Sequence, residues 1–324
     1  MRKRVALVYG GRSGEHEISQ RSAKSILEAL DPAKYEVLHY LISKEGRWSP
    51  RPIVPEPGAN AHIDVVFPVL HGTFGEDGTV QGLLELADLP YVGPGVFASA
   101  AAMDKDAMKR LCRERGLPVV EAVVLSVDDD AVESCRTLPF PLFVKPANLG
   151  SSVGISKVRT PEELAEAVRV ARQFDRKVLV ERGIAGRELE CAVMGNESPL
   201  ASVPCEIIPS KEFYDYEDKY LLDKAQCVVP ANLPEATTAE LRKIAVEAYQ
   251  AIQCEGMARV DFLLEASTNK LYINEVNTIP GFTSISMFPK MWEHMGYPMP
   301  KLLDELIGYA LDRHAKRKAL RYSL

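Results

Sequence analysis

The sequence predicts a mixed α/β fold, α+β overall, that opens with a doubly wound parallel sheet. The apolar stretch at 5–9 runs into a glycine turn and then a helical pattern over about 15–30, which is how a doubly wound α/β unit begins. Towards the other end, 257–264 and 271–277 alternate apolar and polar residues on either side of a polar turn. This alternation predicts an antiparallel hairpin.

Length and composition narrow the class of protein. The 324 residues exceed one ordinary core and predict two or three domains, and a hydrophobic fraction of 46% is typical of a soluble globular protein. The net charge of -6 argues against general binding to nucleic acid or to a membrane surface. No apolar run reaches the roughly 18 residues of a membrane helix. The six scattered cysteines are typical of reduced thiols in a cytosolic protein, so we expect a cytoplasmic location.

The first domain is predicted to continue with strands at 35–42 and 63–70 and a helix at 79–87. Polar residues beyond the carboxyl ends of such strands are where open α/β sheets bind ligands. Glu15 follows the glycine turn, either as an acidic residue that complements the helix dipole or as a partner for a substrate ammonium group. His71 follows the third strand among glycines and acids, which favours a place in the site over a purely structural role.

The middle of the chain contains a candidate phosphate-binding site. After a predicted helix at 105–115, Lys145 lies on a strand just ahead of a glycine- and serine-rich loop at 147–156. The lysine and the backbone amides of the loop could hold phosphates, although surface hairpins often look similar and no Walker A sequence is present.

The next segments suggest contacts to the rest of a nucleotide. A helix at 161–174 leads to a strand at 177–181, whose Glu181 could face an adenine edge. Glu188 could reach ribose hydroxyls, or it could lie on a solvated strand face. A helix at 238–253 then precedes the hairpin.

The hairpin holds the strongest candidate site. If its turn is centred on Thr268, Asp261 lies opposite Glu275, with Cβ atoms roughly 5 Å apart. The same register places Arg259 opposite Asn277. Two carboxylates and a carboxamide on one face are costly unless a cation lies between them, and hard oxygen ligands suit Mg²⁺. Charges pointing to solvent are the alternative, but the Pro- and Gly-containing loop that follows can bring backbone amides to an anion and favours the metal site.

Together these segments resemble the D-alanine–D-alanine ligase family of ATP-grasp enzymes. The resemblance covers nearly the whole chain and implies three domains, namely an α/β substrate-binding domain at 1–104 and two ATP-grasp domains, a lid at 105–187 and a catalytic domain at 188–324. The ATP-grasp domains are expected to be antiparallel sheets packed with helices. The matching motifs, in the family's order, are GGRSGEHEIS (10–19), HGTFGEDG (71–78), MDK (103–105), KPANLGSSVG (145–154), FYDYEDKY (213–220), RVD (259–261) and NEVNTIPG (274–281).

The resemblance implies ATP-dependent ligation of two D-alanines through a D-alanyl phosphate, which supplies a peptidoglycan precursor. It also implies two Mg²⁺ or Mn²⁺ ions and a homodimer. The implied metal ligands are Asp261, Glu275 and Asn277. The residues implied at ATP are Lys105, Lys145, Ser152, Glu181, Ile184, Glu188, Lys219 and Asn274. Those implied at the amino-acid substrates and reacting atoms are Glu15, His71, Ser151, Tyr220, Arg259, Gly281 and Ser286.

Other functions are weighed against this one. A related ATP-grasp ligase could join D-alanine to another acceptor, such as D-lactate or D-serine, but Tyr220 in its loop favours the dipeptide. A nucleotide sensor without catalysis would be expected to lack metal ligands or lid lysines, and none is missing here. A plain α/β binding protein is the remaining alternative, and an ATP-dependent rise in melting temperature would distinguish it from the sensor.

Overall fold

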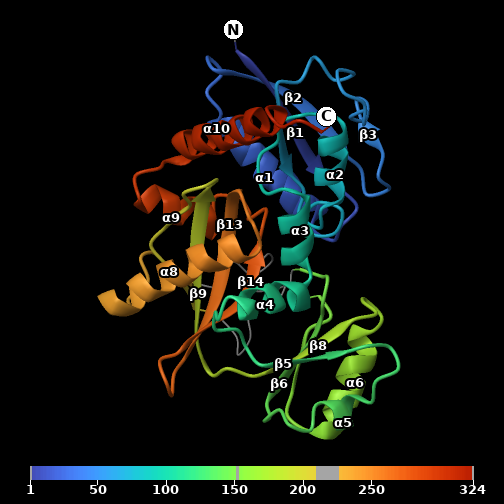
Figure 1. Ribbon diagram of the computed structural model, residues 1–324, viewed down its shortest axis with the longest axis vertical. Helices are drawn as coiled ribbons and strands as arrows, with labels where there is room; N and C mark the ends of the chain where they lie inside the picture. Colours follow the sequence, from blue (N-terminus) through green and yellow to red (C-terminus); the bar gives the residue numbers. More distant parts are fainter. Residues whose placement is uncertain (1, 151–152, 209–225, 323–324) are drawn as a thin grey trace.

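The computed structural model describes residues 2–150, 153–208 and 226–322 (Figure 1). Three sheets follow one another along the long axis of the molecule, with helices packed on each (Figure 1). The first sheet is parallel in its central strands and the other two are antiparallel, so the predicted mixed fold is confirmed. Within the described part of the chain, every helix is too short or too polar to span a lipid bilayer.

The first sheet has the strand order β3-β2-β1-β4. In β1, Val5 and Leu7 face one hydrophobic core while Ala6 and Val8 face another, which explains why this strand is apolar throughout. The elements of this region are β1 (Lys3–Gly10), α1 (His16–Ala29), β2 (Tyr35–Ile42), β3 (Trp48–Ser49), β4 (Val65–Val69), α2 (Thr79–Leu86) and α3 (Val96–Met103).

The second sheet, which we call the middle sheet, has the order β12-β11-β9-β13-β14, with β10 paired to β9. Buried side chains of α8, including Leu241 and Tyr249, cover one face and pack on Val260 and Phe262 of β13. The bounds are β9 (Gly186–Gly195), β10 (Leu200–Ala201), β11 (Cys205–Ile208), β12 (Gln226–Val228), α8 (Glu235–Ala251), β13 (Gly256–Glu265) and β14 (Leu271–Asn277).

The third sheet has the order β5-β8-β6-β7 and a hydrophobic core of its own. Helix α4 precedes this sheet in the chain, yet its Met108 and Cys112 are buried in the core of the middle sheet. The predicted domain bounds at 104 and 187 stay predictions. The elements are α4 (Lys105–Glu114), β5 (Ala122–Leu125), α5 (Ala131–Ser134), β6 (Leu142–Pro146), β7 (Ser156–Val158), α6 (Pro161–Ala171) and β8 (Val178–Arg182).

The C-terminal helix α9 (Met287–His294) packs on β9 of the middle sheet, and α10 (Met299–Lys318) returns to the first sheet. Figure 1 shows α10 lying across α1, and one core contains Leu302 and Leu306 together with Val5 of the first strand. The rings of Phe67 in β4 and Phe282 in the loop after β14 meet edge to face with centroids 5.8 Å apart. The first sheet and the end of the chain therefore share one hydrophobic core.

Candidate functional site

The β13–β14 hairpin pairs Asp261 with Glu275 and Arg259 with Asn277, so the predicted register is confirmed at these positions. The turn itself lies half a residue earlier than predicted, because Leu264 pairs with Leu271. One additional residue in β14, Asn274, forms a bulge that restores the pairing. Bulges commonly re-aim side chains beside active sites, and this one directs both Asn274 and Glu275 towards lysines.

Arg259 and Asp261 form a two-pronged ion pair. Nε and one terminal nitrogen of Arg259 each donate to a different oxygen of Asp261 over 2.7 Å, and Nδ2 of Asn277 donates to the same carboxylate over 2.9 Å. On the other neighbouring strand, Glu190 lies opposite Asp261, with its carboxylate 3.2 Å from Nε of Arg259. Burial alone would lower the pKa of Arg259, but the two carboxylates outweigh it and raise that pKa well above its usual value.

A second charged cluster links the third sheet to α4. The carboxylate of Glu181 in β8 lies 2.7 Å from Nζ of Lys109 and 2.6 Å from Nζ of Lys145. Although burial opposes ionisation, the two ammonium groups lower the pKa of Glu181 to about 2. Lys145 also donates to Oδ1 of Asn274 over 3.0 Å. Lys145 therefore connects the third sheet to the bulge of the middle sheet.

Lys105 makes a parallel connection at the start of α4. Asp104 caps this helix by accepting from the backbone N–H groups of Asp106 and Ala107, each over 3.1 Å, which fixes where the helix begins. Nζ of Lys105 then lies 3.7 Å from Glu275 and donates to the carbonyl of Leu149, in the loop after β6. Both lysines thus lie where the third sheet meets the two carboxylates of the hairpin.

The first sheet supplies a third group of residues. His71 follows β4 and is buried, with Nδ1 3.0 Å from the carbonyl oxygen of Ile279 and Nε2 3.2 Å from Oγ of Ser22. A carbonyl only accepts, so Nδ1 carries the proton and Nε2 accepts from the serine. Burial lowers the pKa of His71, which keeps the ring neutral. His71 therefore fixes the loop after β14 against the first sheet.

Glu15 lies between a loop of the first sheet and a loop of the third. A Cβ built on Gly72 would lie 2.7 Å from Oε2 of Glu15, and one built on Gly150 would lie 3.6 Å from it. Nearby, Glu76 accepts from the backbone N–H groups of Gly72 and Ile279 over 2.6 and 3.1 Å. Burial, and then the charge of Glu15, raise the pKa of Glu76 to about 8.

The loop after β14 places Gly281 beside Ser286. A Cβ at Gly281 would lie 2.7 Å from Oγ of Ser286, so the glycine allows this close approach. The same oxygen accepts from the backbone N–H of Thr283 over 3.0 Å. The backbone N–H of Phe282 reaches Oγ of Ser22 over 3.3 Å. The loop is therefore held between its own serine and the first sheet.

The remaining predicted positions are less closely defined. Ile184 is half-buried in the connection between β8 and β9, and Glu188 on β9 acts electrostatically on Lys145. Predictions for four further residues lie outside the described residues, namely Ser151, Ser152, Lys219 and Tyr220.

Three charged residues of the cluster, Lys109, Glu190 and Glu76, have no role in the sequence prediction. Lys109 lies one helical turn after Lys105 on the same face of α4, and this i, i+4 spacing was an available signal. Glu190 lies in β9, most of which is buried, and its position opposite Asp261 depends on the strand order. Glu76 lies in the matching motif at 71–78, but only the fold shows that it binds the loop after β14.

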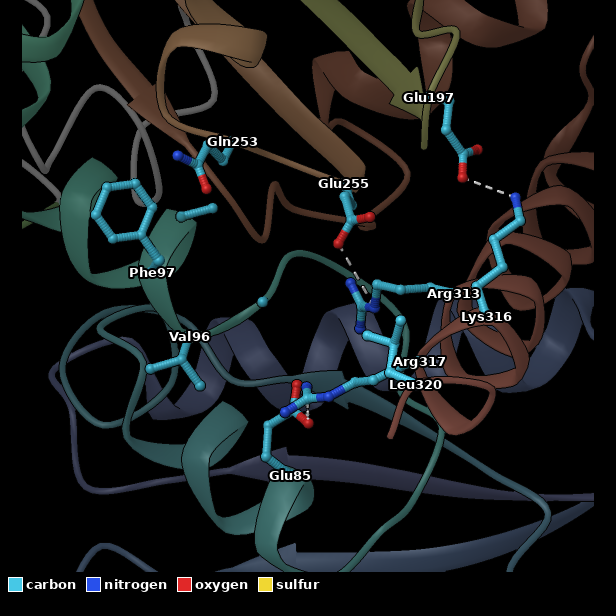
Figure 2. A pocket seen from close by; sticks show the side chains of 12 residues that line it. Glu85, Val96, Phe97, Glu197, Gln253, Glu255, Arg313, Lys316, Arg317 and Leu320 are labelled. Atoms are coloured by element: carbon cyan, nitrogen blue, oxygen red, sulfur yellow. Dashed lines mark hydrogen bonds and ion pairs between the residues drawn. The ribbon is translucent and has the colours of Figure 1, made fainter. Parts of the chain in front are cut away.

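A cavity of about 480 Å³ lies elsewhere, and no predicted site residue lines it (Figure 2). Its basic side chains come from α10, and Figure 2 shows two of them pointing at acids: Arg313 towards Glu255 and Lys316 towards Glu197. Another, Arg317, pairs with Glu85 at the cavity's lower side in this view. Because these charges are already paired within the protein, the charged cluster between the sheets remains the stronger candidate for ATP and amino acids.

Comparisons with known proteins bear on this arrangement. The family model described as "D-ala D-ala ligase C-terminus" matches residues 111–308, and that described as "D-ala D-ala ligase N-terminus" matches 4–56 and 53–94. The D-alanine–D-alanine ligase of Solibacter usitatus is 66% identical over 324 residues, covering 100% of both chains. The chain belongs to the D-alanine–D-alanine ligase family. A family member from Thermoanaerobacter sp. (strain X514) is 49% identical, covering 98% of each chain.

Solved structures of D-alanine–D-alanine ligases and their relatives share the fold. The ligase from Coxiella burnetii superposes with a TM-score of 0.87 at 42% identity, covering 98% of this chain and 96% of that one. The VanG D-Ala:D-Ser ligase from Enterococcus faecalis also gives 0.87, at 35% identity, covering 96% of this chain and 100% of that one. Family membership thus agrees with the predicted ATP-grasp architecture and implies the use of ATP.

Proposed function

We propose that this ligase joins two D-alanines into D-alanyl-D-alanine, with ATP converted to ADP and phosphate, and so supplies a peptidoglycan precursor. The observation that carries the proposal is the convergence of three groups: the hairpin carboxylates, Lys105 and Lys145 beside them, and Glu15 between loops of the first and third sheets. Cations beside carboxylates suit a bound nucleotide and its metal, and the acid suits a substrate ammonium group.

The oxygen-rich end of the hairpin fits a magnesium or manganese ion. Among the described residues, no three His, Cys, Asp or Glu side chains converge as a metal site of their own. Mg²⁺ does not require one, because it keeps several waters and is commonly held by one or two carboxylates together with substrate phosphates. We assign its protein ligands to Asp261, Glu275 and Asn277. Bound there, two such ions would neutralise negative charge on the phosphates of ATP.

The chain's own residues then account for each stage of the reaction. Lys105 and Lys145 bind ATP phosphates, and Glu181, whose carboxylate fixes Lys145, lies at the adenine side with Ile184 and Glu188. Transfer of the terminal phosphoryl group to the carboxylate of the first D-alanine makes an acyl phosphate, since a free carboxylate does not react with an amine. The amine of the second D-alanine attacks it and expels phosphate.

The oxyanion and the two amino acids have separate partners. Glu15 binds the ammonium group of the first D-alanine, and Ser286 lies at the carboxylate of the second. A guanidinium has five N–H groups, so Arg259 can hold Asp261 and still present a donor to the tetrahedral oxyanion, together with the backbone amide of Gly281. Ser151, Ser152, Lys219 and Tyr220 complete the proposed set. From the same resemblance we propose a cytoplasmic homodimer, which light scattering and cell fractionation would check.

Product analysis tests the substrate assignment. ATP and D-alanine alone should give ADP and D-alanyl-D-alanine, identified by mass, while L-alanine should give little ADP. The acceptor is tested by adding D-serine or D-lactate as competitors to D-alanine. Preferential formation of a mixed product would replace the proposal with the D-alanine–D-serine or D-alanine–D-lactate activity.

Two substitutions test the metal assignment. Asp261→Asn and Glu275→Gln should each lower kcat by orders of magnitude at saturating Mg²⁺, because each removes a charged oxygen ligand. The matched control is Glu265→Gln on the same hairpin, whose carboxylate pairs with Arg182 at 2.8 Å instead. Its kcat should stay close to that of the unchanged protein. Near-normal turnover in both site variants would refute the assignment.

A further inference from the structure

Two cysteines on neighbouring strands of the middle sheet have their sulfur atoms in direct contact. Cys205 begins β11 and Cys227 lies in β12, with the two Sγ atoms 2.7 Å apart. Cys227 pairs with Ile207, two positions from Cys205, so the cysteines are diagonal neighbours on one face of the sheet. Unbonded thiols rarely approach so closely, and a disulfide bond measures about 2.05 Å. The strand pairing therefore already holds both sulfurs near bonding distance.

The surroundings of the two thiols differ in a way that separates their roles. Cys205 is fully buried, whereas Cys227 is only partly buried. The hydrogen bond with Cys205, and to a lesser extent the charge of Lys290, lower the pKa of Cys227 to about 7 against the effect of burial. The same hydrogen bond, with burial, raises the pKa of Cys205. Cys227 is thus the nucleophilic thiol and Cys205 the resolving one.

We propose that Cys205 and Cys227 form a redox-active dithiol site that is oxidised by a low-molecular-weight disulfide such as glutathione disulfide. The Cys227 thiolate attacks one sulfur of the oxidant, which forms a mixed disulfide and releases one glutathione thiolate. That thiolate takes up the proton of Cys205, whose sulfur attacks Cys227 and releases the second glutathione. Two protein thiols are oxidised to one disulfide, and one oxidant disulfide is reduced to two thiols.

The site lies beside the proposed active centre without forming part of it. Cys205 pairs across the sheet with Glu190, and the carboxylate of Glu190 lies 3.2 Å from Nε of Arg259. Among the described strands, the three-residue β12 lies at the edge of the middle sheet. The new bond would join this edge covalently to β11, so the reduced and oxidised proteins would differ in how firmly the edge is held.

The test uses the full chain, reduced, freed of reductant and incubated with glutathione disulfide under native conditions. Thiols are then counted after denaturation, and the protein is analysed by intact mass and peptide mapping. We expect the loss of two of the six thiols, no retained glutathione, a mass lower by two hydrogen atoms, and a linked Cys205–Cys227 peptide. Cys205→Ser should stop at a glutathione adduct on Cys227, and Cys227→Ser should keep its remaining thiols reduced.

A matched control separates this reaction from general thiol oxidation. Cys254→Ser removes a buried cysteine from the connection between α8 and β13, and it should still lose two thiols. Because Cys205 lies in the core, the fold of Cys205→Ser is checked by circular dichroism. If that variant unfolds, the proposal is tested by Cys227→Ser and by the peptide map of the unchanged protein. Retention of all six thiols, a stable adduct on the unchanged protein, or a link between other cysteines would overturn the proposal.

Discussion

At the scale of single residues, Lys109 is a buried lysine with a defined partner. Lys109 and Glu181 are each about 2% exposed, and removal of one partner from a buried ion pair commonly costs roughly 3–5 kcal/mol. Lys145 stays 2.6 Å from Glu181, so for Lys109→Met we expect a smaller loss of about 2 kcal/mol in the free energy of unfolding. We also expect a higher KM for ATP. Lys145 is then the only described lysine paired with Glu181, so its ammonium group is less available to the phosphates of ATP. Urea unfolding and steady-state kinetics measure these effects.

The control for Lys109 is Lys243→Met on α8. The Lys243 side chain is 73% exposed, and surface substitutions usually change stability by no more than about 0.5 kcal/mol. Equal stability and equal KM in the two variants would show that the Lys109–Glu181 pair contributes to neither property.

Glu76 predicts a pH dependence of stability. Its pKa is about 8 in the folded protein, against an ordinary value of 4.5. The folded chain therefore keeps a proton that the unfolded chain releases as the pH rises through this window. As the pH rises from the lower of these pKa values to the upper one, the free energy of unfolding should fall by at most about 1.4 kcal/mol per pH unit. Glu76→Gln removes this dependence, so its melting temperature should improve relative to the unchanged protein as the pH rises.

The matched control for this titration is Glu247→Gln on α8, at a more exposed carboxyl group. The difference between this control and the unchanged protein should stay nearly constant from about pH 5 to about pH 8. An equally constant difference for Glu76→Gln would contradict the raised pKa of Glu76.

The partner of a single residue can be predicted from sequence when both residues lie on paired strands of one hairpin. Asp261 and Glu275 could be paired from sequence because strand alternation fixes which side chains share a face. In the sequence, Lys109 cannot be distinguished from a surface lysine on a helix. It is buried because β8 brings Glu181 against it. Glu190 similarly depends on β9 lying next to β13, which no local pattern specifies.

At the scale of elements, the periodic segments and the apolar strands β1 and β4 were predicted well, whereas one apolar helix was not. Strand β2 occupies the predicted residues 35–42, and α4 ends one residue before its predicted end. Helix α3 (VFASAAAM) was missed because its exposed residues, such as Val96 and Phe97, are as apolar as those that it buries against α4 and β14. The bulge at Asn274 was also missed, since an added residue in one strand leaves no periodic signal.

Two glycines in regular elements should respond oppositely to alanine. Gly308 lies exposed inside α10, and a Cβ there meets nothing within 4 Å, so Gly308→Ala should stabilise the protein by about 1 kcal/mol. Gly186 begins β9, and a Cβ there would lie 1.9 Å from the carbonyl oxygen of Leu264, so Gly186→Ala should destabilise it. Urea unfolding of both variants checks the prediction. Shifts of the same sign would show that the local space around these glycines does not control stability.

At the scale of the whole molecule, the third sheet has a separate core, formed by residues such as Leu142 and Val180. We therefore predict that backbone amides of β6 and β8 exchange hydrogen through a local opening of lower free energy than those of β1 and β13. Leu142→Ala should lower protection in the third sheet alone. The matched variant Leu84→Ala, in the core between α2 and the first sheet, should lower it there instead. Uniform loss of protection in both variants would indicate one cooperative unit.

The arrangement of the sheets could be predicted from sequence only through the family resemblance. The contacts that set it are long-range, such as His71 with Ile279 and Lys105 with Glu275. Residues in these pairs are too far apart in the chain for composition or periodicity to connect them. Local patterns therefore predicted the pieces of the site, while packing brings them together.

The position of α10 has a consequence for folding during synthesis. Its Leu302 and Leu306 cover the same core as Val5 and Leu7 of the first strand, with almost the whole chain between them. While the ribosome is still translating the middle of the chain, this face of the first sheet lacks its cover. Nascent chains should therefore offer an apolar surface to chaperones until residues 299–318 have left the exit tunnel.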